Sequence, residues 1–488
     1  MMRIVLVPLD DRPACARLPQ LVAAVAGARM SLPPRPVLPD YRQPGDAASI
    51  ARWLANTPAD ATVVSLETLG FGGLIASRIG REHARDVLGR WSVLSGRTGR
   101  THAATVVQRT PDADDAAEEP AYWAEHGRAL HAYSAQLHRA LRDGTPQPDR
   151  DAVPAEARRD FLRRRHRNHL LNQHALAMAA DGTVATLVIG ADDTAADAVG
   201  SAEWHWLQTW ARWLEPDGQV LSHPGADEIG TALTARALAQ HARITPQIEV
   251  TCADPAGLAR TAAYEPVPVG QGVASQITAA GGVVTTGGTG PVLVVHAPQP
   301  GGHDWAVAPP PAADRSAAEA TAALVGRLIT AGRTVALADC AHPNGADPAL
   351  LELLCADGTL SRLAGFAGWN TAGNSIGTAV AHLVAVLAGK ATGTFDSTAH
   401  QRLLAHRVAE DHCYMSHARA RVRAQIGADP TRHDHIPAGT DVPARIEHAV
   451  TERWQQLDPV PGWRVRTGSV TLPWQRTFEI DLDVEKDR

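Results

Sequence analysis

The chain has few of the residues that would place it in several common protein classes. Its five cysteines are scattered over 488 residues, odd in number and without a CxxC pair, which excludes a disulfide framework and a zinc ribbon. Basic residues do not outnumber acidic ones, and the net charge of −6 disfavours a general affinity for nucleic acid. Phenylalanine and tyrosine are also scarce, with five of each against twelve tryptophans.

Long apolar runs are missing as well. We find no stretch that approaches the roughly 20 apolar residues of a membrane helix. The N-terminal sequence MMRIVLVPLDDRP passes from one arginine directly into a short apolar run that ends in charged residues, so it lacks the layout of a secretory signal. We therefore expect a soluble, cytoplasmic protein with no membrane partner, and the sequence leaves its oligomeric state open.

Short runs rich in valine, isoleucine and leucine recur along the chain. Each ends at glycine, proline or aspartate and precedes an alanine-rich segment with helical spacing, as expected of repeated β-loop-α units around a parallel sheet. The clearest strand candidates are residues 4–7, 62–65, 104–107, 185–189, 219–222, 247–251, 292–296 and 334–338. About eight such units predict an α/β fold with a (β/α)8-type barrel; the alternative is a two-lobed, doubly wound parallel sheet.

The units are unevenly spaced, which suggests additions to a barrel-like body over residues 1–390. Residues 112–180 contain no strand candidate and read as a helical insertion. Residues 391–488 are expected to form a helical and β extension, because apolar residues alternate between 478 and 484 as in a half-buried strand.

Acidic side chains recur directly after the predicted strands. Ligands of parallel α/β sheets bind at the carboxyl ends of the strands, and helix capping alone requires only one acidic or hydroxyl group per helix. Several carboxylates that face one cavity must share protons, bind metal or pair with bases. The strand-end residues that we single out are Asp10, Asp11, Arg12, Glu67, Arg78, Asp192, Asp193, His223, Asp227, Glu228, Asp339, Trp369, Asn370 and Asn374.

Paired carboxylates near tryptophan are typical of glycoside hydrolysis, which needs two carboxyl groups and a flat apolar surface for the sugar ring. We therefore expect a glycosidase that acts on a small sugar or aminosugar, with Asp192, Asp193, Asp227 and Glu228 as the catalytic pool. Trp369 is the candidate ring platform. The remaining residues of the set would bind sugar hydroxyls.

Two alternatives stay open. The first is a divalent-metal hydrolase, because Asp10, Asp11, Asp192, Asp193, His223 and Asp339 together would suit Mg²⁺ or Mn²⁺. No HExxH or similar spacing is present, so we assign no metal ligand and expect no cofactor. The second alternative is a non-catalytic protein that binds a sugar or another metabolite.

Several segments resemble a bacterial family known as domain-of-unknown-function family 4127. They are VPLDDRP (7–13), PGD (44–46), SLETLGFGGLIASR (65–78), GADD (190–193), PGADE (224–228), FAGWNTAGNSIGTA (366–379) and LPWQRTFE (472–479). Glu67 stands where the family usually has aspartate, which keeps the carboxylate. The resemblance implies no activity, but its segments are nearly those that the strand-end residues mark.

A shorter resemblance links HPGADE (223–228) to the H-x-GGDE segment of hexosaminidases that use the acetamido group of the substrate. That resemblance implies that Glu228 is the general acid and that Asp227 orients the acetamido group. Ala226 stands where those enzymes have glycine.

Overall fold

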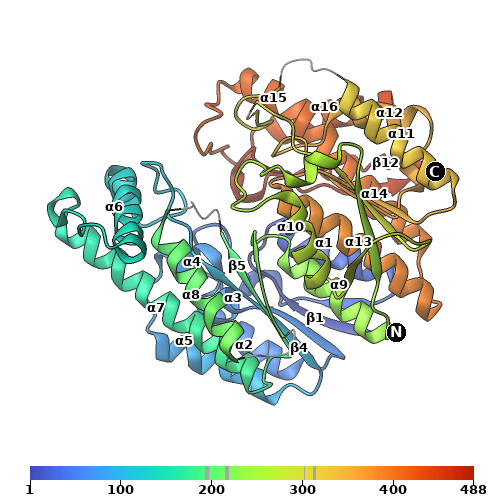
Figure 1. Ribbon diagram of the computed structural model, residues 1–488. Helices are drawn as coiled ribbons and strands as arrows, with labels where there is room; N and C mark the ends of the chain where they lie inside the picture. Colours follow the sequence, from blue (N-terminus) through green and yellow to red (C-terminus); the bar gives the residue numbers. More distant parts are fainter. Residues whose placement is uncertain (193–196, 215–218, 302, 311–314, 488) are drawn as a thin grey trace. The chain divides into compact units, whose positions relative to one another are not determined.

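Two separate parallel sheets form the framework of the protein. The computed structural model describes residues 1–192, 197–214, 219–301, 303–310 and 315–487. By their internal contacts these residues divide into two compact units (Figure 1). The N-terminal unit comprises Arg3–Asp11 and Met30–Gly230, and the C-terminal unit comprises Met1–Met2, Arg12–Arg29 and Thr231–Arg488.

The N-terminal unit is built on a six-stranded sheet with the order β2-β1-β3-β4-β5-β6. The pairs from β1 through β3, β4 and β5 to β6 are parallel. Every residue of β3 and β5 is buried, as expected of parallel strands with helices on both faces. The strands are β1 (Arg3–Val7), β2 (Arg29–Ser31), β3 (Ala61–Ser65), β4 (Arg100–Val107), β5 (Thr186–Ala191) and β6 (Val220–Pro224).

Aliphatic side chains and two tryptophans, Trp91 and Trp204, fill the core of this unit. The helices that contribute to the unit are α2 (Ala47–Asn56), α3 (Leu66–Phe71), α4 (Leu74–Ile79), α5 (Ala84–Trp91), α6 (Trp123–Asp143), α7 (Ala155–Ala180) and α8 (Val199–Leu214).

The segment predicted as a helical insertion carries α6 and α7, joined by a short 3-10 turn. Trp123 of α6 packs on Phe161 of α7, with ring centroids 5.9 Å apart. These two residues belong to a small hydrophobic cluster separate from the main core. Figure 1 shows α6 standing clear of the strands of its own unit.

The C-terminal unit is built on a five-stranded parallel sheet with the order β11-β10-β9-β7-β8. A small antiparallel pair, β12 and β13, lies apart from this sheet. The strands are β7 (Gln247–Cys252), β8 (Val283–Thr285), β9 (Val292–His296), β10 (Val335–Asp339), β11 (Gly365–Ala367), β12 (Trp463–Val465) and β13 (Val484–Lys486).

The helices of this unit include a buried π-helical stretch, Ala409–Ala418, that continues α14. The others are α1 (Pro13–Val25), α9 (Ile229–Ala242, which begins in the N-terminal unit), α10 (Val269–Ala279), α11 (Ser316–Thr330), α12 (Pro348–Ala356), α13 (Ala372–Thr392), α14 (Ser397–Val408), α15 (Arg419–Ile426) and α16 (Val442–Leu457).

The α/β class with parallel sheets is confirmed, whereas the barrel is not, because neither sheet closes on itself within the described residues. The alternative of a two-lobed arrangement of parallel sheets fits. The two units divide at residues 11, 29 and 230, and residue 390 lies within α13. In the C-terminal segment Ile480 and Leu482 are buried as their alternation predicts, but the strand begins only at Val484.

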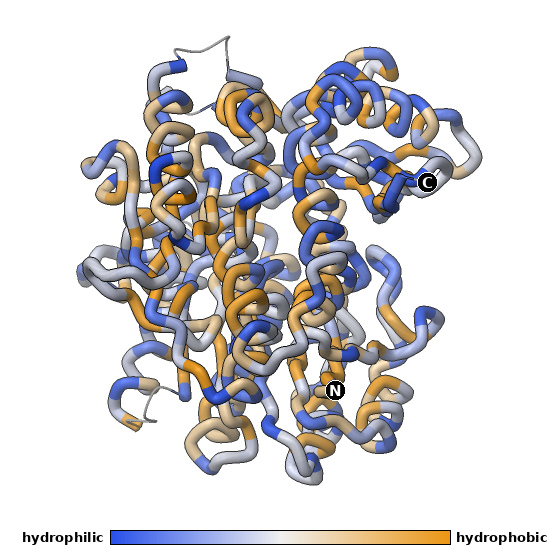
Figure 2. Tube along the Cα trace, turned by 90° about the vertical axis from the view of Figure 1, so that its right-hand side faces the viewer, coloured by the Kyte–Doolittle hydropathy of each residue, from blue (hydrophilic) through white to orange (hydrophobic). Residues whose placement is uncertain are grey.

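One helix corrects the expectation that no stretch is long and apolar enough for a membrane. By length and composition α13 could cross a membrane, since its most apolar 18-residue stretch has a mean hydropathy of 1.4, but 94% of this stretch is buried within the protein. This burial is typical of the core helix of a soluble protein. Figure 2 shows hydrophobic stretches along inner strands and helices, and hydrophilic residues at outer turns.

We predict that Gly72→Ala destabilises the protein by more than about 1 kcal/mol. Gly72 ends α3 in a left-handed conformation (φ 82°), and a Cβ there would lie 2.3 Å from the carbonyl oxygen of Gly45. Urea unfolding measures the change.

The matched control for this substitution is Gly89→Ala in α5, where a Cβ would meet no atom within 4 Å. This change should raise the free energy of unfolding by about 0.5–1 kcal/mol. Equal effects of the two substitutions would contradict the steric argument.

Candidate functional site

The predicted site residues divide between the carboxyl ends of the two sheets. Asp193 lies outside the described residues. In the N-terminal unit are Asp10, Asp11, Glu67, Arg78, Asp192, His223, Asp227 and Glu228, and in the C-terminal unit are Arg12, Asp339, Trp369, Asn370 and Asn374.

Two carboxylates of the N-terminal unit come together although their strands are far apart in the sheet. Asp10 lies three residues beyond β1 and Asp227 three residues beyond β6, with β3, β4 and β5 between those strands. A carboxylate oxygen of Asp10 nevertheless lies within 4.8 Å of one of Asp227. Carboxylate oxygens at this spacing fit the ligand set of a divalent cation, so we take the pair as the centre of the candidate site at this edge.

Glu228 is fully buried beside His223 at the end of β6. The Nδ1 atom of His223 lies 3.5 Å from Oε1 of Glu228 and donates a hydrogen bond of 2.9 Å to the carbonyl oxygen of Pro224. Burial lowers the pKa of His223, which keeps the ring neutral near pH 7. The neutral ring therefore lies beside the carboxyl group of Glu228 without adding a charge there.

Gly225 allows this arrangement. Its φ of 101° lies in the left-handed region, and a Cβ there would lie 2.5 Å from Oε1 of Glu228. A side chain at position 225 would thus displace the Glu228 carboxyl group, so the glycine of the HPGADE motif has a steric role.

Arg78, on α4, binds carboxylates from two loops of the N-terminal unit. Its guanidinium donates to Asp192 at 2.5 Å and to Glu118 at 2.9 Å. Burial and the neighbouring Arg109 lower the pKa of Arg78, but Asp192, Glu119 and Glu118 together raise it above its usual value. Asp192 is therefore present as a charge-compensated carboxylate.

Residues that sequence reasoning missed complete this cluster. Arg109 pairs with Glu118 at 3.0 Å and with Glu119 at 3.2 Å, and Gln108 accepts a hydrogen bond from Arg78. Gln108 and Arg109 directly follow β4, so the strand-end rule could have found them. Glu118 and Glu119 lie about ten residues farther along, where no pattern marks them.

Two further predicted residues of this unit have partners of their own. Glu67 accepts hydrogen bonds from Ser65, Thr105 and the backbone N–H of Val106, at 3.0, 3.1 and 2.7 Å, while burial raises its pKa. These bonds tie α3 to β4, so a role of Glu67 in binding sugar hydroxyls is not part of the proposal below. Asp11 pairs with Arg35 at 3.1 Å.

In the C-terminal unit Asp339 belongs to a coupled acid–base group at the ends of β9 and β10. His296, which sequence reasoning missed, lies with Nε2 3.1 Å from Oδ2 of Asp347, and Asp347 donates its backbone N–H to Asp339. Burial raises the pKa of Asp339 to about 6, against the opposing effect of His296. This group is largely buried, and it holds the loop that leads into α12.

The other predicted residues of the C-terminal unit are engaged within it. Trp369 is buried and donates its indole N–H to Thr378, so its role as a ring platform is not part of the proposal below. Asn374 forms a capping box with Thr371 at the start of α13. Arg12 lies over the ring of Trp474 at 4.6 Å.

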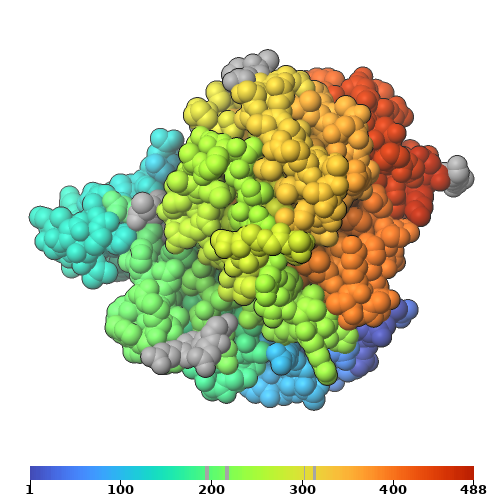
Figure 3. Space-filling model, turned by 45° about the vertical axis from the view of Figure 1, so that its right-hand side comes forward, coloured from blue at the N-terminus to red at the C-terminus, as the bar shows by residue number. Residues whose placement is uncertain are grey.

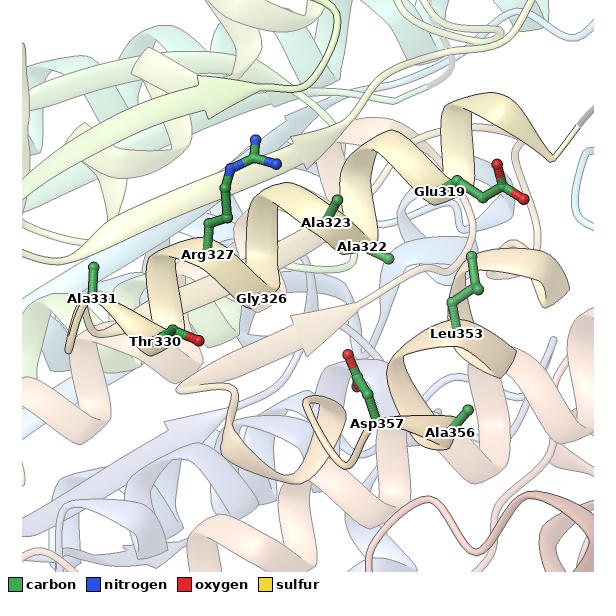
Figure 4. A pocket seen from close by; sticks show the side chains of 10 residues that line it. All are labelled: Glu319, Ala322, Ala323, Gly326, Arg327, Thr330, Ala331, Leu353, Ala356 and Asp357. Carbon is green, nitrogen blue, oxygen red and sulfur yellow. The ribbon is translucent and has the colours of Figure 1, made fainter.

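A groove lies between α11 and α12 of the C-terminal unit, but it carries little chemistry. Its volume is about 850 Å³, and it lies where the yellow surface of residues 316–357 is exposed (Figure 3). Alanine and glycine make up half of its lining, and Glu319, Arg327 and Asp357 are its charged residues (Figure 4). We therefore place the candidate site at the sheet ends.

The chain belongs to a family described as protein of unknown function (DUF4127), whose model matches residues 4–483. This match confirms the family that the sequence motifs indicate. No curated protein and no solved structure matches the chain significantly.

A buried charge cluster in the π-helical stretch generates a prediction about stability. Arg407 pairs with Glu410 at 3.0 Å and with Asp411, and Asp411 accepts the backbone N–H of Gly368. Burial raises the pKa of Glu410 from 4.5 to about 8, although Arg407 lowers it. Between about pH 4.5 and about pH 8 the folded protein therefore holds a proton on Glu410 that the unfolded chain has lost.

We predict that Glu410 makes the protein less stable as pH rises from about 4.5 to about 8, because the folded state binds more protons in this window. In Glu410→Gln this part of the pH dependence should disappear. Chemical unfolding at several pH values measures it, with Glu125→Gln at an exposed position of α6 as the control. Parallel pH profiles for wild type and Glu410→Gln would contradict the prediction.

Proposed function

We propose that the protein is a hydrolase that cleaves the glycosidic bond of a small sugar or aminosugar. The observation that carries this proposal is the approach of the Asp10 and Asp227 carboxylates to within 4.8 Å. Asp227 directly precedes Glu228 in the sequence. Glycoside hydrolysis uses two carboxyl groups in different protonation states. A close pair of carboxylates next to a buried acid supplies such groups.

In this proposal Glu228 is the general acid that protonates the leaving oxygen. Burial lowers the pKa of His223, so the neutral ring, 3.5 Å from Glu228, leaves the acid its proton. Asp10 and Asp227 then act on the other side of the bond, as nucleophile, as base, or by orienting an acetamido group. Asp192, balanced by Arg78, binds sugar hydroxyls.

The same pair of aspartates also favours a second candidate, a hydrolase that depends on a divalent cation. Carboxylate oxygens are the ligands that Mg²⁺ and Mn²⁺ prefer, and two of them within 4.8 Å would repel each other less with a cation between them. In this case the cation, and not Glu228, would activate the attacking water.

We predict that Glu228→Gln lowers kcat about 10²–10⁴-fold, because the amide cannot give up a proton. Asp227→Asn and Asp10→Asn should lower it by at least about 10². Turnover of a panel of nitrophenyl glycosides, including the N-acetylglucosaminide, measures these effects, and thermal melts check the fold.

Asp86→Asn, in an exposed position of α5, is the control for the loss of a carboxylate and should leave turnover unchanged. Full activity of both Asp227→Asn and Glu228→Gln on an identified substrate would overturn the assignment of the acid.

We predict that turnover persists in EDTA if the carboxyl groups act alone. Its loss on chelation and recovery with Mg²⁺ or Mn²⁺ would favour the metal-dependent candidate. Stabilisation by a sugar without any product would instead indicate a binding protein.

A further inference from the structure

The N-terminal unit exposes a cluster of three tryptophans on α8. Trp206, Trp210 and Trp213 recur with helical spacing, so they lie on one face of this helix. They are 43%, 38% and 62% exposed, whereas Trp204 of the same helix is buried in the core. Soluble monomers rarely expose large contiguous apolar patches, and such patches mark interaction sites.

The three indole rings hold one another in place. Each ring packs edge-on against the other two, with centroids 5.4–5.9 Å apart. Because the rings already constrain one another, docking onto them orders few additional side chains. At about 250 Å² for a whole tryptophan side chain, the exposed fractions leave roughly 350 Å² of aromatic surface. This is nearly half of the roughly 800 Å² that each partner buries in a standard interface.

A groove between α7 and α8 continues the apolar surface of the tryptophan cluster. The two helices lie side by side (Figure 1). Arg165 of α7 pairs with Glu203 near the start of α8, and farther along both helices Ala180 lines the groove together with Trp210 and Leu214. The helices therefore run parallel. The groove has a volume of about 540 Å³.

The exposed face of α7 carries opposite charges at its two ends. Arg163, Leu170 and Asp181 are exposed and recur with helical spacing, so they share one face of the helix. Arg163 and Asp181 lie almost equally far along the chain from Gln173, which lines the groove together with Trp210. Turning the helix pair end for end thus sets Arg163 opposite Asp181 and leaves Trp210 in the middle.

We infer that this face of α7 and α8 is the interface of a homodimer, in which a second copy of the chain docks about a two-fold axis. A two-fold interface joins the same patch of both subunits, so the patch must be complementary to itself. With each helix antiparallel to its counterpart, Trp210 meets Trp210, and Arg163 meets Asp181 of the second copy at both ends.

This inference is independent of the proposed glycosidase activity. No residue of the interface belongs to the proposed catalytic group. Tryptophan is enriched among the residues that dominate binding energy near the centre of an interface, which is where the two-fold axis places Trp210. The flanking charges add specificity, because they are matched only in the antiparallel arrangement.

The first test is sedimentation equilibrium of the full chain over a range of micromolar concentrations. We expect a dimer for the wild type and a dissociation constant at least about thirtyfold higher for Trp210→Glu, as for the loss of a dominant interface residue. The control is Val284→Glu, which adds the same charge at an exposed apolar position of β8 in the C-terminal unit. This variant should dimerise like the wild type.

The second test reverses one of the flanking charges. Asp181→Arg should raise the dissociation constant about three- to tenfold, because it sets guanidinium groups against each other at both ends of the interface. Adding Arg163→Glu in the same chain should restore the wild-type value. This rescue separates two-fold docking from unspecific association of exposed rings.

Three outcomes would overturn the inference. They are a wild-type monomer at every concentration, equal dimerisation of wild type and Trp210→Glu, and no rescue of Asp181→Arg by Arg163→Glu. Thermal melts in dilute solution check the fold of each variant, and Trp213→Glu, at the most exposed of the three rings, replaces Trp210→Glu if that variant unfolds. Glu228→Gln should lose turnover and still dimerise, so the two proposals fail separately.

Discussion

The meeting of carboxylates at the ends of parallel strands is the constraint on which the candidate site depends. A parallel sheet directs the carboxyl end of every strand to one edge, so side chains from distant segments meet there. Asp10 and Asp227 follow different strands of the N-terminal sheet and still approach within 4.8 Å. Carboxylates at this spacing are suited to share the two roles that hydrolysis requires, or to bind one cation.

In a second cluster at the same edge, carboxylates form ion pairs with guanidinium groups. Arg78 and Arg109 form direct ion pairs with Asp192, Glu118 and Glu119. Removing one partner of a buried pair typically costs about 3–5 kcal/mol, so these residues hold their loops in place.

The sequence predicts the strands of both sheets better than their arrangement. All eight strand candidates correspond to observed strands, whereas β2, β8 and β11 were missed. Those three are three residues long and end their sheets, so they bury too few side chains to produce a pattern. A barrel and two open sheets share the same local β-loop-α units, and only contacts between distant strands distinguish them. The strand-end rule likewise located Asp10 and Asp227, but no local pattern marks Asp347.

The two sheet edges differ in the chemistry that they offer. The N-terminal edge presents carboxylates and guanidinium groups, which suits proton transfer to a glycosidic oxygen. The C-terminal edge holds Asp339, Asp347 and His296, which are largely buried and bond to one another, so these groups support the loop that leads into α12. The charged groups of the N-terminal edge are better suited to stabilising the charge that develops as a bond breaks.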